Sequence, residues 1–297
     1  MTARTDRALA AGVAVARAHG LAVREPVLLG DAANVLVHLR PAPLVARVAT
    51  MTPRLRPDIT RPLGREVALA TALTAAGAAV VPPSELLPPG PHEHDGLHVS
   101  FWRHLEFRPE RPTASEAGRA LGELHDVLAG LPPLWAGSPL DTPLDDLAVF
   151  AERGTELRAD PALVERTAEL TNRLRPLLGG PAMTLHGDPH PGNLLRTADG
   201  LVWADFEDTS RGPRGWDLAC LRTTRRVDGR AAVDALPEPM TDEELAPFVW
   251  LRRLHAGAWW FVHAERDPVD LPEAVARLTA AVEEVSAGLR AAPQGPG

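Results

Sequence analysis

The stretch HGDPHPGN at residues 186–193, followed by VWADFED at residues 202–208, decides how this chain of 297 residues is interpreted. Glycine and proline fill half of the first stretch, a composition typical of a tight turn, and the turn carries Asp188 and Asn193. Asp205 ends the apolar run that follows, which predicts a strand. A tight loop can direct both of its polar side chains into one cleft, and carboxylate and amide oxygens are the ligands that hard cations prefer. The two stretches therefore predict a cleft that holds a hard cation beside a free carboxylate.

These stretches resemble the catalytic and metal-binding loops of the aminoglycoside phosphotransferase family, which is related to choline kinases and more distantly to protein kinases. The resemblance implies that Asp188 is the catalytic base and that Asn193 and Asp205 hold Mg²⁺. It places His190 where protein kinases carry a lysine, so His190 would touch the transferred phosphate, and it implies that His186 braces the loop. Phosphoryl transfer suits such a site, because the protein mainly positions groups and neutralises charge.

The first third of the chain supplies weaker matches to the same family. Arg47, in the apolar run VARVA, stands where protein kinases have their phosphate-binding lysine, and Glu66 follows at a spacing that fits the expected ion pair. Gly30 and Asn34 bound the segment GDAAN, which lies where the nucleotide-covering loop is expected but has one glycine instead of several. An ordinary edge-strand arginine and a solvated helix face are the alternative interpretations of Arg47 and Glu66.

Two further positions take their roles from the resemblance. Residues 101–105 would form the hinge, where backbone groups of Arg103 and Leu105 would meet the adenine. Asp217, at the start of a predicted helix, matches a family position that we assign to structure, with N-terminal capping as the physical reason.

The order of the predicted elements is sheet first and helices later, which indicates an α+β fold. We expect a two-lobed, protein-kinase-like unit: residues 1–103 form a small nucleotide-binding lobe with a mostly antiparallel sheet, and residues 104–297 form a larger helical lobe for catalysis and substrate binding. Two capping boxes are predicted, at Thr113 and at Thr241. The expected strands lie at residues 35–39, 44–48 and 97–105, the expected helices at residues 65–76, 163–178, 216–224, 241–265 and 272–289, and a loop at residues 132–145; residues 291–297 are expected to be disordered.

Composition limits the classes of function. A net charge of -8 argues against a general nucleic-acid binder, and the single cysteine, Cys220, excludes an internal disulfide and suits a reducing compartment. No run approaches the length of about 20 apolar residues that crosses a bilayer. We interpret the weakly apolar residues 8–16 as an opening helix instead of a signal peptide, and we expect a cytoplasmic protein. All 31 basic residues are arginines.

The resemblance implies a small-molecule kinase that moves the γ-phosphate of ATP or GTP, with Mg²⁺, to an alcohol group. Aminoglycoside-like antibiotics, amino alcohols and sugars are the expected acceptors, with antibiotic resistance as one role. Asp208 follows Asp205 and is a candidate for facing the substrate, with a solvated side chain as the alternative. Glu265 and Asp267 lie near a tryptophan-rich segment and would suit a cationic substrate, although a solvated helical face explains them equally well. The expected partners are thus a nucleotide and a small hydroxylated substrate, without nucleic acid or membrane.

Two other classes of function stay open. The single glycine of the segment GDAAN and the presence of Arg47 in place of lysine would fit a kinase-like binding protein with little catalysis. An H-x-D-x-H string, formed by His186, Asp188 and His190, would fit a metal-dependent hydrolase. This interpretation leaves Asn193 and Asp205 without a role. His92, His94 and His98 cluster in a Pro-rich stretch and could suggest a metal site, but we interpret them as polar residues of a flexible hairpin loop.

Overall fold

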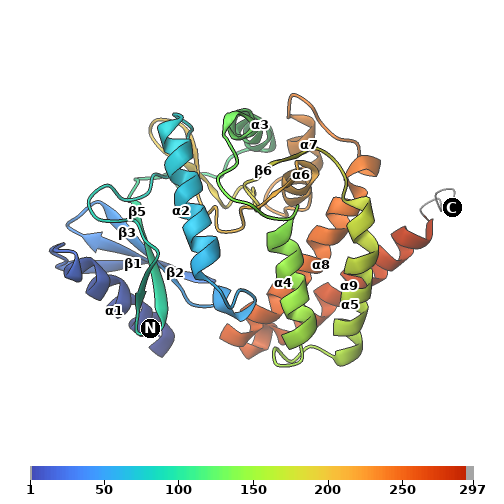
Figure 1. Cartoon of the computed structure of the whole chain (residues 1–297), viewed down its shortest axis with the longest axis horizontal. Helices are drawn as coiled ribbons and strands as arrows, with labels where there is room; N and C mark the ends of the chain where they lie inside the picture. The colour runs from blue at the N-terminus through green and yellow to red at the C-terminus, as the bar shows by residue number, and fades with distance from the viewer. Residues whose placement is uncertain (1, 292–297) are drawn as a thin grey trace.

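The computed structural model describes residues 2–291, and its N-terminal part is built on a five-stranded antiparallel sheet. The strands lie in the order β1-β2-β3-β5-β4. Their bounds are β1 (Glu25–Asp31), β2 (Asn34–Arg40), β3 (Leu44–Ala49), β4 (His92–His94) and β5 (Leu97–Arg103). Figure 1 shows the sheet and α1 at one end of the molecule, α2 beside the sheet, and the later helices at the other end.

The sheet buries one face against α1 (Ala3–Ala18). Gly12 lets this helix lie close to the sheet, because a Cβ at Gly12 would come within 2.9 Å of the Ala46 Cβ on β3. Side chains alternate between the faces of a strand, so Arg47 points to the other face, where α2 (Thr60–Ala75) lies.

The C-terminal part is mostly helical. Its helices are α3 (Ala114–Gly130), α4 (Asp141–Arg153), α5 (Pro161–Leu174), α6 (Gly215–Arg222), α7 (Gly229–Asp234), α8 (Asp242–Arg266) and α9 (Leu271–Ala291). The short elements are the 3₁₀ turns η1 (Thr52–Arg54), η2 (Arg175–Leu177) and η3 (Pro268–Asp270) and the strands β6 (Ala182–Thr184), β7 (Leu194–Arg196), β8 (Leu201–Trp203) and β9 (Arg211–Pro213). β6 pairs with β9 and β7 with β8. The aromatic core between α4, α6 and α8 includes Phe150, Trp216 and Phe261, all buried.

The α+β class and the arrangement of a sheet lobe followed by helices are confirmed. Both predicted capping boxes are present, Thr113 with Glu116 at α3 and Thr241 with Glu244 at α8. β5 ends at Arg103, beside the expected boundary between residues 103 and 104, and the division into two functional domains stays a prediction.

Some expected elements differ from the structure. The loop predicted at residues 132–145 is too long, because α4 already begins at Asp141 and carries Pro143 in its first turn, where proline is tolerated. β1 was not predicted as a strand; its side chains are mostly half-buried, so its sequence lacks a clear alternation. The expected disorder of residues 291–297 falls outside the described residues, apart from Ala291, which ends α9.

No helix within residues 2–291 has the length and apolar character that a membrane span needs.

Candidate active site

The HGDPHPGN loop follows β6 and touches the VWADFED segment through the backbone. Gly187 has a φ of +96°, a conformation that favours glycine. A Cβ at Gly187 would lie only 2.0 Å from the carbonyl oxygen of Asp208. The two stretches singled out in the sequence therefore pack directly against each other, and this contact requires glycine.

Asp217 on α6 holds this loop in place. Its buried carboxylate accepts hydrogen bonds from the backbone N–H groups of His186, at 3.0 Å, and Gly187, at 2.9 Å, and lies 2.9 Å from the His125 Nε2. The expected capping role is wrong, since α6 begins at Gly215 and its capping residue, Arg214, makes no side-chain cap. Asp217 has a structural role, because it fixes the backbone of the loop that carries Asp188, the proposed base.

The His186 ring fills the core below the loop. Its centroid lies 4.4 Å from that of Phe206 and 5.1 Å from that of Trp203, and burial lowers the pKa of His186. This placement fits a loop brace. Within residues 2–291, no three His, Cys, Asp or Glu side chains are arranged to hold a metal ion, so His186, Asp188 and His190 do not form the three-ligand site that the hydrolase hypothesis needs.

The Asp188 carboxylate lies close to the side chains of Arg252 and His190. Its Oδ1 accepts a hydrogen bond of 2.6 Å from Nη2 of Arg252 on α8, and its Oδ2 lies 3.5 Å from the His190 Nε2. Burial alone would raise the pKa of Asp188, but Arg252 and His190 outweigh it and hold the pKa below its usual value. Asp188 is therefore ionised at neutral pH, as a general base must be.

Asn193 and Asp205 are brought together by the β7–β8 hairpin. The Asn193 carbonyl oxygen accepts a hydrogen bond of 2.8 Å from the backbone N–H of Ala204, the residue before Asp205. The Asn193 Nδ2 donates to the Asp188 carbonyl oxygen at 3.0 Å, which leaves its Oδ1 for a ligand. Asp205 has a φ of +67° and a side chain that is 42% exposed. Two oxygen donors thus lie on neighbouring backbone positions beside Asp188.

Arg47 connects the sheet to this hairpin. Its Nη1 donates to Glu66 on α2, so the expected ion pair is present, and its Nη2 contacts Asp205 at 2.7 Å and Glu207 at 2.6 Å. Glu66 also accepts a hydrogen bond from the backbone N–H of Phe206 at 3.1 Å. The interpretation of Arg47 as an ordinary edge-strand arginine does not fit this position, because its side chain is only 6% exposed.

Three carboxylates, those of Glu66, Asp205 and Glu207, share the Arg47 guanidinium. Burial raises the pKa of Glu66 to about 8 and that of Glu207 to about 7, with Arg47 opposing both shifts. Burial would lower the pKa of Arg47 itself, but Glu207, Glu66 and Asp205 raise it above its usual value. Three carboxylates thus face one guanidinium, and the raised pKa values of Glu66 and Glu207 mean that protons offset part of their charge near neutral pH.

Gly30 and Asn34 flank the turn between β1 and β2. Gly30 lies in β1, next to a register shift. The Asn34 side chain is buried: its Nδ2 donates to both Glu207 oxygens at 3.2 Å, and its Oδ1 accepts from the Thr52 Oγ1 at 3.2 Å. Asn34 therefore links the turn to the ADFED segment, and direct contact of either residue with nucleotide stays a prediction.

The expected hinge, residues 101–105, includes the last three residues of β5 and the two residues after it. The backbone N–H of Arg103 donates to the Pro82 carbonyl at 2.9 Å, and that of His104 donates to the Pro43 carbonyl at 2.8 Å. Within the described residues, the backbone N–H of Leu105 has no such backbone partner, and contact of Arg103 or Leu105 with an adenine stays a prediction.

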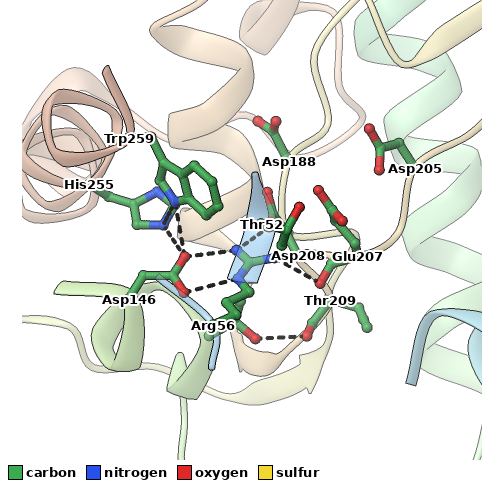
Figure 2. A network of polar contacts seen from close by, with 12 residues as sticks. Thr52, Arg56, Asp146, Asp188, Asp205, Glu207, Asp208, Thr209, His255 and Trp259 are labelled. Carbon is green, nitrogen blue, oxygen red and sulfur yellow. Dashed lines mark hydrogen bonds and ion pairs between the residues drawn. The ribbon is translucent and has the colours of Figure 1, made fainter. Parts of the chain in front are cut away.

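Figure 2 shows a polar network next to Asp188, centred on Arg56. The Arg56 guanidinium donates to both carboxylate oxygens of Asp146 on α4, at 2.9 and 2.7 Å, to the Glu207 carbonyl oxygen at 3.2 Å, and to the Asp208 Oδ1. Asp208 is thus occupied by an ion pair with Arg56, and its expected contact with a substrate stays a prediction.

Asp146 is also bonded to α8. It accepts from the His255 Nε2 at 2.8 Å and from the Trp259 Nε1 at 3.0 Å. Burial alone would raise the pKa of Asp146, but Arg56 and His255 hold it well below its usual range. The network therefore ties α4 and α8 to the segment between η1 and α2.

The other two acidic candidates make contacts of their own. Glu265 is paired with Arg54, which donates to it at 2.5 Å, and Asp267 accepts from the backbone N–H of Val269 at 3.1 Å. Both carboxylates have partners already, so a role in binding the acceptor stays a prediction.

Sequence reasoning missed Arg56, Asp146, Arg252 and His255. For Asp146, Arg252 and His255 the available signal was their position within apolar helical patterns: Asp146 lies between buried leucines of α4, and the other two lie beside buried leucines of α8. Arg56 lies between η1 and α2, outside any helical pattern. A charged or polar side chain on the buried face of a helix needs a partner, but the pattern alone does not identify that partner.

The sequence and the fold of this chain are similar to those of known phosphotransferases. Residues 23–238 match the phosphotransferase enzyme family. No curated protein matches the chain.

Three solved structures are similar in fold. A choline/ethanolamine kinase family protein from Mesorhizobium loti is 18% identical with a TM-score of 0.60, covering 95% of this chain and 97% of its own. Amicoumacin kinase in complex with AMP-PNP, Ca²⁺ and Ami is 14% identical with a TM-score of 0.67, covering 96% of both chains. The GDP and kanamycin complex of APH(2″)-IIia is 16% identical with a TM-score of 0.61, covering 90% of this chain and 95% of its own.

At these identities the solved structures establish the fold, a kinase-like sheet lobe followed by helices. The family match adds the broad activity, since it spans the sheet and the segment that carries Asp188, Asn193 and Asp205. The chain therefore belongs to the phosphotransferase enzyme family.

Proposed function

We propose that this protein is a kinase that transfers the γ-phosphate of ATP or GTP to a hydroxyl group of a small molecule. The observation that carries the proposal is the grouping of Asp188, Asn193 and Asp205 on two loops in backbone contact, with Arg47 reaching Asp205. Phosphoryl transfer needs this combination of a base, metal-binding oxygens and a cation for the phosphates.

Asp188 is the proposed base. Arg252 occupies Oδ1, so Oδ2 is the atom that would receive the proton of the acceptor hydroxyl. The new bond forms between the acceptor oxygen and the γ-phosphorus, the bond from that phosphorus to the β–γ bridging oxygen breaks, and the nucleoside diphosphate leaves. The lowered pKa of Asp188 keeps the carboxylate ionised, so it can orient the hydroxyl as a hydrogen-bond acceptor and take the proton as the bond to phosphorus forms.

Asn193 and Asp205 fit a Mg²⁺ site. The Asn193 amide group turns its nitrogen to the Asp188 carbonyl, so its oxygen remains as a donor, and one Asp205 oxygen is not engaged by Arg47. Both are hard oxygen ligands of the kind Mg²⁺ uses together with phosphate oxygens. Magnesium bound there would neutralise charge on the β- and γ-phosphates.

Arg47 and His190 would complete the phosphate site. Arg47 is fixed by Glu66 and always protonated, so it would offer a cation without adjusting its position. His190 lies 3.5 Å from the Asp188 carboxylate and would approach the transferred phosphate. The solved AMP-PNP and GDP complexes of similar fold support a purine nucleotide as donor.

The acceptor belongs to the range that the similar folds span, which includes choline-type alcohols and kanamycin, and we extend it to other hydroxylated antibiotics and sugars. A role in antibiotic resistance follows only for an antibiotic acceptor. A binding protein with little catalysis is the second candidate, favoured by the three carboxylates that already share Arg47.

The test is nucleotide turnover with Mg²⁺ across aminoglycosides, other hydroxylated antibiotics, amino alcohols and sugars, using wild type, D188N and D205N. D199N is a matched control, because Asp199 is an exposed aspartate on the turn between β7 and β8. We expect turnover with at least one acceptor, a loss of about 10²–10⁴-fold in D188N with nucleotide binding kept, loss of Mg²⁺-dependent binding in D205N, and no change in D199N. Absence of turnover together with absence of Mg·ATP and Mg·GTP binding would favour the second candidate, whereas nucleotide binding without turnover would mean that the acceptor lies outside the panel.

A further inference from the structure

Arg252 is a buried cation aimed at the proposed base from a helix far along the chain. It projects from α8, and its Nη2 lies 2.6 Å from the Asp188 Oδ1. The exposed fractions of the two side chains are 16% and 20%. A buried, charge-assisted hydrogen bond of this length restricts the carboxylate far more than an exposed ion pair does.

The contact distinguishes the two oxygens of Asp188. Oδ1 is engaged by Arg252, whereas the nearest titratable partner of Oδ2 is the His190 Nε2 at 3.5 Å, beyond a good hydrogen bond. A carboxylate held by one oxygen presents the other in a fixed direction. The Arg252 contact therefore selects the oxygen that is left for an acceptor.

Arg252 is itself held in position. Its guanidinium lies 6.0 Å from the centre of the Trp216 ring, and its Nη1 lies 3.4 Å from the His255 Nδ1. Trp216 also donates its indole N–H to the Gly187 carbonyl oxygen at 2.7 Å. The same tryptophan thus contacts the backbone before Asp188 and the arginine that holds its side chain.

A second connection runs from Arg252 to the ADFED segment. The other ring nitrogen of His255, Nε2, lies 2.8 Å from Asp146. Asp146 pairs with Arg56, which bonds the Glu207 carbonyl oxygen next to the proposed metal ligands (Figure 2). Arg252 is therefore braced by groups that also fix the loop opposite Asp188.

We propose that Arg252 is a positioning residue that holds Asp188 Oδ1 and thereby presents Oδ2 to the acceptor, an inference that rests on the proposed kinase function. Such an arrangement contributes through orientation, and a displacement of about 1 Å at a reacting group can cost about 10²-fold in rate. Arg252 need not touch substrate in this role.

The test uses R252M, which keeps the bulk of the side chain without its charge, and R252K, which restores a cation. R253M is the matched control, because Arg253 is the next residue of α8 but is more exposed and pairs with Glu284 on α9. The first readout is hydrolysis of Mg·ATP with water as the acceptor, so that it does not depend on the identity of the natural acceptor. It is repeated with any acceptor that wild type phosphorylates.

R252M is expected to lower kcat about 10- to 100-fold while the KM for Mg·ATP changes less than about 3-fold. R252K recovers part of kcat, R253M matches wild type, and R252M adds no further loss to D188N, because both changes act through one carboxylate. Equal effects of R252M and R253M, or full additivity with D188N, would overturn the proposal.

A crystal structure of R252M, or of R252K should R252M not fold, gives a second readout that needs no activity. In R252M we expect the Asp188 carboxylate to turn away from its wild-type orientation. In R252K we expect it to keep that orientation when the lysine Nζ replaces Nη2 as the donor to Oδ1. An unmoved Asp188 in R252M, or a displaced one in R252K despite that contact, overturns it. Absence of both Mg·ATP and Mg·GTP binding by wild type would instead refute the kinase function, so the two failures are distinguishable.

Discussion

Replacing Gly187 with alanine should damage both stability and activity, since this glycine forms the backbone contact between the two loops. Two costs add in G187A. A φ of +96° is unfavourable for alanine by about 1–2 kcal/mol. The new Cβ would also lie 2.0 Å from the Asp208 carbonyl oxygen, a backbone atom that cannot move away alone, and overpacking of this kind costs about 1–3 kcal/mol.

Gly77 provides the control, with a φ of +75° and no atom within 4 Å of the place that a Cβ would occupy. G77A should therefore lose only the stability that the positive φ costs an alanine. We expect urea unfolding, followed by tryptophan fluorescence, to show G187A about 1–3 kcal/mol less stable than G77A. Turnover should fall about 10²-fold in G187A, because the shift displaces Asp188 from Asp205. Equal stability of the two variants, or full turnover by G187A, would refute the reasoning.

Three other substitutions test separate parts of the structure. Arg56 and His255 hold the pKa of Asp146 below its usual value near 3.9, so the contribution of Asp146 to stability is present above about pH 4 and is lost as the pH falls further. The stability of wild type should therefore fall more steeply below about pH 4 than that of D146N. Parallel acid-unfolding curves of the two proteins would contradict this. At pH 7, D146N should itself be about 3–5 kcal/mol less stable by urea unfolding, as the buried Arg56 loses its main partner. D217A removes the acceptor of two backbone N–H groups and should lower stability by about 2–4 kcal/mol. D228A, which removes only an exposed cap of α7, should lose about 1 kcal/mol, and calorimetry that ranks the two variants in the reverse order would exclude the bracing role. R47M should weaken Mg·ATP binding in a titration more than R54M does, since Arg54 pairs with an exposed glutamate; equal affinities would contradict a phosphate contact at Arg47.

The parts of the site that sequence reasoning anticipated are local or regularly spaced. Asn193 and Asp205 meet through a short hairpin, and Arg47 and Glu66 sit on a strand and the next helix, where chain geometry limits how far apart they can lie. The α+β order could also be predicted from regular spacing, because the apolar residues change once along the chain from the alternation of strands to the period of helices.

The contacts that escaped prediction join residues far apart in sequence. Arg252 reaches Asp188 from α8, and His255 reaches Asp146 across the same core. Periodicity shows that such residues lie on the buried face of a helix, but the partner depends on how the helices pack. Asp217 shows the same limit: its place in the first turn of α6 suggests a cap, whereas tertiary packing directs it to the neighbouring loop.

The most direct test of the central claim follows the phosphorus itself. ³¹P NMR of Mg·ATP or Mg·GTP with the acceptor panel should show the γ-phosphate signal decline while a phosphate monoester appears on one acceptor with wild type, and no monoester with D188N. Monoester formation at equal rates by wild type and D188N would contradict Asp188 as the base, and nucleotide that neither binds nor reacts would contradict the kinase assignment.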